Sequence, residues 1–460
     1  MSEISPTIFR AYDIRGTHPD QLNSKMVETL GQAIGTYAKH QGQTTVVTAR
    51  DGRLSGPELQ DALNHGLIRA GMRVVDIGMV PTPVLYHAAL TLGTGSGVMV
   101  TGSHNPPKFN GFKMMIGGHT LYGKDITNLY EMITQSKLVV GEGSLTTVDA
   151  LSPYIRQIIG DIHLIKSLKV AIDCGNGVAG VCARSLFEQL GCKVFPLFTE
   201  VDGTFPNHHP DPSKPENLTD VIDSVLSEKC DLGLAFDGDG DRVGIVTEKG
   251  QSIFADRLMM MLSRDILSRN TGATIIYDVK CSRHLGPVIK QAGGHPLMWK
   301  TGHSLVKAKM KETGALLGGE MSGHIFFKER WLGFDDGLYT AARLLEIFAK
   351  SNQTVSSMFE VIPDDVSTPE LNIEVPDTEK FAIVERVASI IADQGLPLST
   401  IDGVRVDLDS GWGLIRSSNT TPNLVLRFEA ESTEALAEIQ STILDALKQA
   451  EPTLELGSIC

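Results

Sequence analysis

Three aspartates alternate with glycines in Asp237-Gly-Asp239-Gly-Asp241, and this spacing lets their carboxylates converge on one point. Two carboxylates about 4 Å apart repel each other by about 4 kcal/mol at an effective dielectric constant of 20. A bound divalent cation removes this repulsion, and oxygen ligands favour Mg²⁺ or Ca²⁺ over softer metals. The alternative is a solvated acidic loop, which so short a motif can also be. We predict a metal site formed by the three aspartates.

A calcium loop between two helices is the rival metal site, because the three aspartates would occupy its first, third and fifth positions and Glu248 its twelfth. The sixth position of such a loop requires glycine for a sharp turn, and here it is Arg242. The preceding segment, Asp231–Phe236, has the continuous apolar pattern of a buried strand, not of a helix. These two differences favour Mg²⁺.

A possible nucleophile lies in Thr101-Gly-Ser-His-Asn-Pro106, where Ser103 follows a glycine at the end of an apolar strand. A serine needs a base or a metal to act as a nucleophile, and His104 is its neighbour in sequence. Ser103 could instead be the N-cap of a helix. Lys113, in Asn110-Gly-Phe-Lys, could supply charge or a proton to the same site, although a lone lysine is usually a solvated surface group.

Two further loops carry polar side chains that suit a phosphorylated ligand. Arg416-Ser-Ser-Asn-Thr-Thr-Pro422 combines a guanidinium, an amide and hydroxyls, which together with backbone amides can bind a phosphate monoester; an ordinary hydrogen-bonded turn would use the same residues. Gly319-Glu-Met-Ser-Gly-His324 adds a carboxylate, a hydroxyl and an imidazole. A nucleophilic serine, a metal loop and a phosphate loop together favour phosphoryl transfer, which depends mainly on positioning and charge stabilisation.

The elements that position these loops recur three times along the chain. Each unit begins with an apolar strand that runs into a turn, as in 44–52, 168–175 and 273–280, and a helical stretch follows. A glycine then ends each helix before a second strand, at Gly71, Gly191 and Gly293. A third strand leads into the serine loop, the aspartate loop or the Glu-Ser-His loop. Because ligands bind beyond the carboxyl ends of strands in α/β sheets, three repeated domains could direct three loops to one cleft.

The pattern changes after Pro363. Residues 378–394 and 433–449 have the periodicity of amphipathic helices, and 403–408 that of a strand. We therefore expect a smaller α+β domain at the C-terminal end, and this domain carries the Arg416–Pro422 loop.

Composition limits the classes of protein. The 460 residues are 42% hydrophobic, enough for several cores, and a formal net charge of −14 argues against nucleic-acid binding, which needs clustered Lys and Arg. The six cysteines lack a CxxC pair, as expected for reduced thiols. No leader pattern and no apolar run of about 18 residues is present. We expect a cytoplasmic protein with no membrane anchor, and the oligomeric state, a monomer included, stays open.

With these motifs in family order, the chain resembles the α-D-phosphohexomutases, and most closely their bacterial phosphomannomutase/phosphoglucomutase branch. The resemblance extends over essentially the whole chain and rests on five segments, namely Phe9–Gly16, Thr101–Pro106, Asp237–Arg242, Gly319–His324 and Arg416–Pro422. It implies an α/β fold with three similar mixed α/β/α domains and a smaller C-terminal α+β domain around a central cleft. The corresponding boundaries are 1–149 for the phosphoserine domain, 150–252 for the metal-binding domain, 253–366 for the sugar-recognition domain and 367–460 for the phosphate-binding domain.

The resemblance also implies a role for each candidate residue. Ser103 would carry the phosphoryl group, and a phosphoserine oxygen would join Asp237, Asp239 and Asp241 around one Mg²⁺ per chain. Lys113, His104 and His324 are the alternatives for the general acid and base, and Arg242 would complete the catalytic group. The remaining substrate-binding residues would be Tyr12, Arg15, Lys280, His303, Glu320, Ser322, Arg416, Ser418, Asn419 and Thr420, with His324 also contacting the sugar.

The activity that the resemblance implies is the interconversion of hexose 1-phosphate and hexose 6-phosphate through a 1,6-bisphosphate, with glucose 1,6-bisphosphate as activator. Such an intramolecular phosphotransferase would serve carbohydrate metabolism and polysaccharide biosynthesis, with a phosphosugar as its only expected partner. Gly102 and Met321 favour mannose and glucose, because glucosamine mutases typically have alanine before the serine and glutamine in the sugar loop. The alternatives are a phosphoglucosamine mutase, a Mg²⁺-dependent sugar phosphatase, and a sugar-phosphate sensor without a covalent phosphate.

Overall fold

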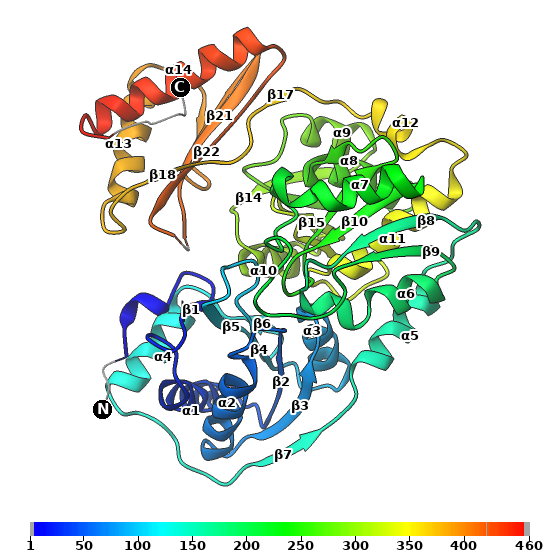
Figure 1. The fold of residues 1–460 in the computed structure, drawn as a ribbon. Helices are drawn as coiled ribbons and strands as arrows, with labels where there is room; N and C mark the ends of the chain where they lie inside the picture. The colour runs from blue at the N-terminus through cyan, green and yellow to red at the C-terminus, as the bar shows by residue number, and fades with distance from the viewer. Residues whose placement is uncertain (1–3, 420, 455–460) are drawn as a thin grey trace. The chain divides into compact units, whose positions relative to one another are not determined.

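A computed structural model describes residues 4–419 and 421–454 of the chain, and Figure 1 shows the fold as a ribbon. The candidate phosphate ligand Thr420 lies outside the described residues. The chain forms two compact units. The first contains the chain up to Leu258 together with His303–Val361, and the second contains Met259–Gly302 and the described chain from Ile362 onward. The chain therefore passes between the units three times.

A seven-stranded sheet begins the first unit, in the order β1-β5-β4-β2-β3-β7, with β6 paired to β5. Strands β4, β2, β3 and β7 run parallel, whereas β5 is antiparallel to β4, β1 and β6. The strands are β1 (Ile14–Thr17), β2 (Thr45–Arg50), β3 (Arg73–Met79), β4 (Gly97–Val100), β5 (Phe109–Ile116), β6 (His119–Thr120) and β7 (Ser144–Thr147).

The helices of this first α/β segment supply its apolar core. Helix α1 begins after Asn23, whose side chain accepts a hydrogen bond from the Met26 amide as an N-cap. Apolar side chains of α1, α2 and α4 are buried in one cluster with those of the sheet. The helices are η1 (Pro6–Ile8), α1 (Ser24–His40), α2 (Gly56–Arg69), α3 (Thr82–Thr91) and α4 (Lys124–Thr134). Helix α5 (Leu151–Asp161) follows β7 and begins the second segment.

The second α/β segment repeats this arrangement with a five-stranded sheet in the order β12-β11-β10-β8-β9. Strand β10 runs parallel to β8 and antiparallel to β11, and all five of its residues are buried. The strands are β8 (Lys169–Asp173), β9 (Lys193–Leu197), β10 (Leu232–Phe236), β11 (Val243–Thr247) and β12 (Ser252–Ile253); the helices are η2 (Val178–Val181), α6 (Ala183–Gln189), η3 (Pro215–Leu218) and α7 (Thr219–Glu228). The element before the aspartate loop is thus a strand, as predicted, and not the helix of a calcium loop.

The third α/β segment contributes elements to both units. Helix α8 (Ala255–Leu267) runs from the first unit into the second, where β13 (Thr274–Asp278) and β14 (His295–Trp299) pair in parallel around α9 (Leu285–Gln291). In the first unit, β15 (Leu317–Gly319) and β16 (Ile325–Phe327) pair antiparallel. The helices there are α10 (His303–Thr313), α11 (Gly337–Lys350) and α12 (Val355–Glu360).

The C-terminal segment of the second unit is a six-stranded antiparallel sheet with two helices, α13 (Lys380–Asp393) and α14 (Thr433–Ala450). Its core combines apolar side chains of both helices with those of the sheet. The strands are β17 (Val366–Ser367), β18 (Leu371–Glu374), β19 (Leu398–Ser399), β20 (Val404–Leu408), β21 (Gly411–Ser417) and β22 (Asn423–Ala430).

These elements confirm the repeat and the change of pattern that the sequence predicted. The predicted first strands correspond to β2, β8 and β13, and the loops with reactive side chains follow β4, β10 and β15. After Pro363, the predicted helices and strand correspond to α13, α14 and β20. Within the described part of the chain, no helix combines the length and the apolar character that crossing a membrane requires.

Candidate active site

The three aspartates of the metal motif directly follow β10 and are fully buried. One carboxylate oxygen from each lies within 4.8 Å of the others. Within residues 4–419 and 421–454, Oδ1 of Asp239 and Oδ1 of Asp241 are buried without a hydrogen-bond partner. Burial raises the pKa of both Asp237 and Asp241 to about 7, and the neighbouring carboxylates add to this effect. Buried carboxylate oxygens that lack donors are the ligands that a divalent cation requires, so these residues fit Mg²⁺.

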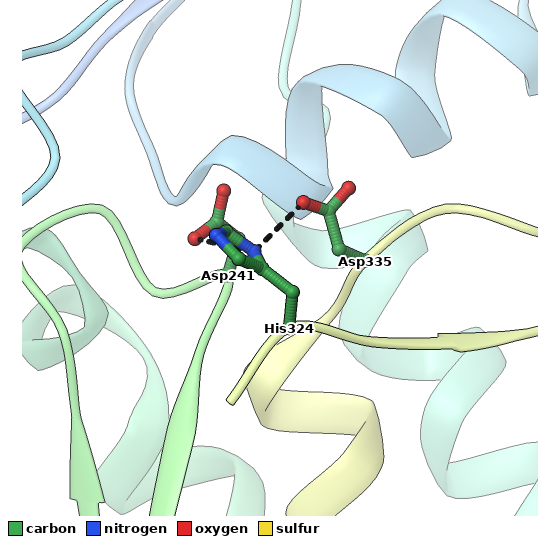
Figure 2. Close-up of side chains that lie close together, drawn as sticks. All are labelled: Asp241, His324 and Asp335. Carbon is green, nitrogen blue, oxygen red and sulfur yellow. Dashed lines mark ion pairs between the residues drawn. The ribbon is translucent and has the colours of Figure 1, made fainter. Parts of the chain in front are cut away.

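His324 reaches one of these carboxylates, that of Asp241, from the loop between β15 and β16 (Figure 2). Its Nδ1 lies 3.5 Å from Oδ1 of Asp241 and 3.0 Å from Oδ2 of Asp335. Lys307 Nζ lies 2.8 Å from Oδ1 of Asp335. Burial alone would raise the pKa of Asp335, but the charge of Lys307 and the hydrogen bond with His324 hold this pKa well below its usual value. His324 is also paired with Arg242 through an isolated antiparallel bridge, which places the Glu-Ser-His loop beside the metal loop.

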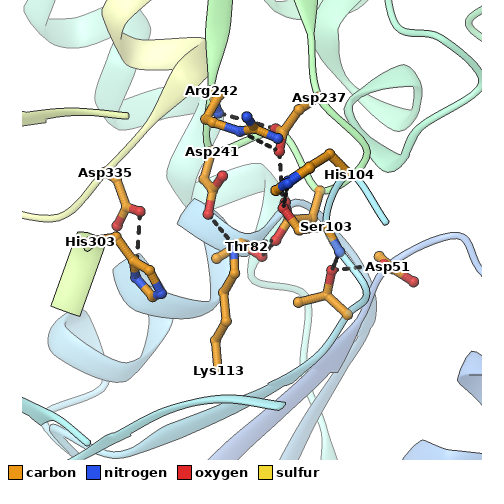
Figure 3. Close-up of polar contacts among 12 residues, drawn as sticks. Asp51, Thr82, Ser103, His104, Lys113, Asp237, Asp241, Arg242, His303 and Asp335 are labelled. Carbon is orange, nitrogen blue, oxygen red and sulfur yellow. Dashed lines mark hydrogen bonds and ion pairs between the residues drawn. The ribbon is translucent and has the colours of Figure 1, made fainter. Parts of the chain in front are cut away.

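Ser103 lies in the loop between β4 and β5, with its side chain directed toward the metal loop (Figure 3). Its Oγ donates a hydrogen bond to Oδ2 of Asp237 at 3.2 Å and lies 3.2 Å from Nδ1 of His104. Burial and the positive charge of Arg242 hold the pKa of His104 well below its ordinary value. The next element is a strand, so the alternative in which Ser103 begins a helix is wrong.

Lys113 projects from β5 toward Asp241 of the metal loop (Figure 3). Its Nζ donates to Oδ2 of Asp239 at 2.7 Å and also pairs with Oδ2 of Asp241. Burial alone would lower the pKa of Lys113, but the two carboxylates outweigh it and hold this pKa well above its ordinary value. Lys113 is therefore a buried charge and not the solvated lysine of the alternative interpretation. Thr82, at the start of α3, donates to the same oxygen of Asp239 at 2.5 Å.

Arg242 connects the metal loop to a segment that carries none of the predicted site residues. Its backbone amide donates to Oδ1 of Asp237 at 3.1 Å, and its Nε lies 3.0 Å from Oδ2 of the same residue. Its Nη1 lies 3.3 Å from Oδ1 of Asp211, which ends the run His208-His-Pro-Asp211. Both Arg242 and Asp211 are buried. The only sequence signal for Asp211 was the pair of histidines, His208 and His209, that precedes it.

Five other predicted substrate ligands lie in the first unit. Tyr12 packs edge-on against His303, with the ring centroids 5.8 Å apart, and Arg15 donates to Oδ1 of Asn105 in the serine loop at 2.9 Å. His303 is buried and stacks on His324 at 5.6 Å. In the loop after β15, the Ser322 hydroxyl donates to Oε2 of Glu320 at 3.3 Å.

The remaining predicted ligands belong to the second unit. Lys280 pairs with Glu370 at 2.8 Å, and Arg416 Nε lies 3.0 Å from Oδ2 of Asp402. In the turn between β21 and β22, Ser418 Oγ accepts the Thr421 amide at 3.1 Å. Asn419 is partly exposed beside it. Among the described residues of this loop, the contacts fit both a turn and a phosphate site.

Comparisons with known proteins extend these observations to the whole chain. Models of the phosphoglucomutase/phosphomannomutase family match in order: α/β/α domain I at residues 6–139, domain II at 152–250, domain III at 254–365 and the C-terminal domain at 370–446. The phosphomannomutase/phosphoglucomutase of Pseudomonas putida is 55% identical over 451 residues, which cover 98% of this chain and 97% of that protein. The phosphoglucomutase of Neisseria meningitidis is 48% identical over 458 residues, 99% of each.

A solved structure agrees with this match. The crystal structure of a phosphoglucomutase/phosphomannomutase family protein from Burkholderia thailandensis superposes with a TM-score of 0.93 and 52% sequence identity. It covers 98% of this chain and 99% of that one. Three α/β/α domains followed by a C-terminal domain confirm the predicted fold class. The chain belongs to the phosphoglucomutase/phosphomannomutase family, as its five motifs predicted.

Proposed function

We propose that this protein is a phosphohexomutase, an intramolecular phosphotransferase that interconverts the 1-phosphates and 6-phosphates of mannose and glucose. The observation that carries the proposal is the contact of Ser103 Oγ with Asp237 inside a cluster of three buried aspartates. Relatives with 55% and 48% identity over nearly the whole chain are named for phosphomannomutase and phosphoglucomutase activity. We propose the predicted domain boundaries and residue roles on the same basis.

The metal in this proposal is one Mg²⁺ per chain, held by Asp237, Asp239, Asp241 and an oxygen of phosphorylated Ser103. Two buried carboxylate oxygens that accept no hydrogen bond within the described residues support this assignment. Bound there, Mg²⁺ would neutralise charge on the phosphoryl oxygens and make the phosphorus more open to attack. Lys113 adds a second fixed positive charge within reach of the same two carboxylates.

In the first half of the reaction, a sugar hydroxyl attacks the phosphorus of phosphoserine and the bond from phosphorus to Ser103 Oγ breaks. A proton must leave the hydroxyl and another must reach the serine oxygen. His104 lies 3.2 Å from that oxygen, so it is placed to exchange the proton there. His324, oriented by Asp335, is the candidate for the sugar hydroxyl. Lys113 is held charged by its two carboxylate partners, which suits it to charge stabilisation more than to accepting a proton.

The product of this step is a hexose 1,6-bisphosphate, which turns around and returns its other phosphate to Ser103. Glu320 accepts hydrogen bonds, and Ser322 can donate or accept them, so one loop can bind sugar hydroxyls in both orientations. Arg416, Ser418, Asn419 and Thr420 would bind the phosphate that is not transferred, and Lys280 would complete the substrate pocket. Glucose 1,6-bisphosphate would act as activator because it can rephosphorylate an unphosphorylated serine.

We place this activity in the cytoplasm. All five cysteines in the described chain are buried and free of disulfides, as expected in a reducing compartment. The proposed pathways are carbohydrate metabolism and polysaccharide biosynthesis, which consume both sugar phosphates.

Phosphorus NMR tests the proposed function directly. The protein is incubated with Mg²⁺, a trace of glucose 1,6-bisphosphate, and, in separate tubes, mannose 1-phosphate, glucose 1-phosphate or glucosamine 1-phosphate. We expect the 6-phosphates of mannose and glucose to form. Release of inorganic phosphate would instead identify a phosphatase, conversion of glucosamine 1-phosphate alone would identify a glucosamine mutase, and no reaction in any tube would refute the mutase.

A further inference from the structure

Ser103 has a backbone conformation that serine rarely adopts. Its φ is 49°, in the left-handed region, although it is not a glycine. A residue of this kind keeps such a conformation only where the surrounding structure enforces it, and these residues concentrate at functional sites. The contacts around Ser103 therefore identify what holds the nucleophile in place.

Arg53, which follows β2, makes most of these contacts with the serine loop. Its guanidinium is buried, with a side-chain exposure of 0%. One nitrogen, Nη2, donates to the carbonyl oxygens of Ser103 at 2.8 Å and Asn105 at 2.6 Å. The other, Nη1, donates to those of Pro106 and Phe109, both at 2.8 Å. One side chain thus fixes three carbonyls of the loop that carries the nucleophile and the carbonyl of Phe109, where β5 begins.

Asp51 completes the arrangement and lies beside the loop that carries Ser103 (Figure 3). Its Oδ2 accepts hydrogen bonds from Arg53 Nε at 3.2 Å, from the Thr101 hydroxyl at 2.7 Å and from the Gly102 amide at 3.1 Å. The Thr101 hydroxyl in turn accepts the Ser103 amide at 2.8 Å. Both the amide and the carbonyl of Ser103 are therefore held through one pair of residues. We call Asp51 and Arg53 the serine clamp.

We propose that Arg53, oriented by Asp51, is the positioning residue that directs Ser103 Oγ toward the metal loop for phosphoryl transfer. This inference rests on the proposed function. The guanidinium is suited to the task because its five N–H donors have a rigid planar arrangement. A lysine at the same position keeps the charge but cannot hold two pairs of carbonyls at fixed angles. In-line transfer depends on the position of the reacting atoms, and a misplacement of about 1 Å can lower a rate by about 100-fold.

The test compares Arg53→Lys with Arg343→Lys, a matched replacement of another fully buried arginine that pairs with Glu329 away from this loop. Steady-state kinetics with glucose 1-phosphate are measured well below each melting temperature and normalised to the folded fraction by circular dichroism. For Arg53→Lys we expect kcat to fall about 100-fold with KM changed less than threefold. For Arg343→Lys we expect a lower melting temperature with kcat within twofold of the wild type.

Thr101→Val is a second variant, in case Arg53→Lys does not fold. It removes the hydroxyl that links Asp51 to the Ser103 amide while keeping the side-chain shape, and we expect kcat to fall about tenfold. A wild-type kcat in a folded Arg53→Lys or Thr101→Val protein would overturn the proposal, as would a loss of kcat in Arg343→Lys as large as in Arg53→Lys.

Hydrogen exchange of the resting protein separates this inference from the proposed function. Amide exchange in a peptide spanning 101–110 should be faster in Arg53→Lys than in the wild type, while a peptide from α11 should be unchanged. This measurement needs no substrate. If the wild type proves inactive with both sugars, the proposed function fails. Unchanged amide exchange in Arg53→Lys would show, independently of activity, that the clamp does not hold the loop. If the wild type is active and exchange is unchanged, only the inference fails.

Discussion

At the scale of single residues, Ser103 should be indispensable, because its Oγ donates to the metal-loop carboxylate of Asp237 and also lies 3.2 Å from Nδ1 of His104. In Ser103→Ala, we expect turnover to be lost to below 0.1% of the wild-type rate, on the order of the loss seen when a nucleophile is removed. A coupled assay with glucose 1-phosphate measures it, and intact mass should show a phosphate increment only in the wild type. Ser263→Ala, a buried serine of α8, is the control and should keep normal activity.

A variant without Ser103 that still turns over the sugar phosphate at a normal rate would contradict the assignment of the nucleophile. A phosphate increment that persists in that variant would place the modification on another residue.

The aspartates of the metal loop should couple Mg²⁺ binding to stability. In the metal-free protein, burial and the charge of Asp239 raise the pKa of Asp241 to about 7. A cation that binds only the folded state should stabilise it, by about 2.7 kcal/mol at 100 times its Kd. We expect Mg²⁺ to raise the melting temperature of the chelated wild type and to leave that of Asp241→Asn unchanged. Asp220→Asn, an exposed aspartate of α7, should respond like the wild type.

Differential scanning fluorimetry across a Mg²⁺ titration measures this effect without reference to activity. A shift of equal size in Asp241→Asn would show that the cation binds elsewhere.

At the scale of elements, the sequence predicted the strands and the loops after them, because both depend on local patterns. Buried apolar runs predicted β2, β8 and β10, and the reactive loops follow the carboxyl ends of strands as the α/β rule requires. The partners of those loops could not be predicted. Arg53 contacts Ser103 across 50 residues of sequence, and Asp335 contacts His324 across 11 residues. Neither Arg53 nor Asp335 belongs to a motif that suggests chemistry. The left-handed backbone of Ser103 also has no signal in its residue type.

The loop His208–Ser213 is an element whose stability should depend on pH. Burial alone would lower the pKa of His208, but its hydrogen bond to Asp173 at 3.0 Å and that residue's charge raise the pKa above its ordinary value of 6.5. The folded state therefore keeps a proton that the unfolded chain releases, so the stabilisation is complete below pH 6.5 and is lost as the pH rises through the folded-state pKa.

We expect His208→Gln to be less stable than the wild type at pH 5.5, with a smaller difference at pH 8.5. Urea unfolding at a series of pH values gives the difference in the free energy of unfolding between variant and wild type. For the control His65→Gln, at an exposed position of α2, this difference should not vary with pH. A gap between His208→Gln and the wild type that widens toward high pH would mean that His208 is neutral in the folded state.

At the scale of the whole molecule, the candidate residues are divided between two units that the chain connects three times. The first unit contains the serine, metal and sugar loops, and the second contains Lys280 and the loop with Arg416 and Ser418. If the second unit binds the phosphate that is not transferred, as proposed, removing one of its phosphate contacts should weaken substrate binding while the chemistry at Ser103 stays intact. Variants of second-unit residues should thus change mainly KM, and variants of first-unit catalytic residues should change mainly kcat.

Arg416 is the residue that tests this division. Its guanidinium is buried and lies 3.0 Å from Asp402, and a charge-assisted contact with a phosphate should contribute about 1.5–3 kcal/mol. We expect Arg416→Ala to raise KM for glucose 1-phosphate about 10-fold to 100-fold, with a smaller change in kcat, whereas Arg386→Ala, on the exposed side of α13, should leave both unchanged. Initial rates over a wide substrate range separate the two constants. A fall in kcat at constant KM would instead place Arg416 with the residues that act on the transferred phosphate, and a wild-type KM would remove the second unit from phosphate binding.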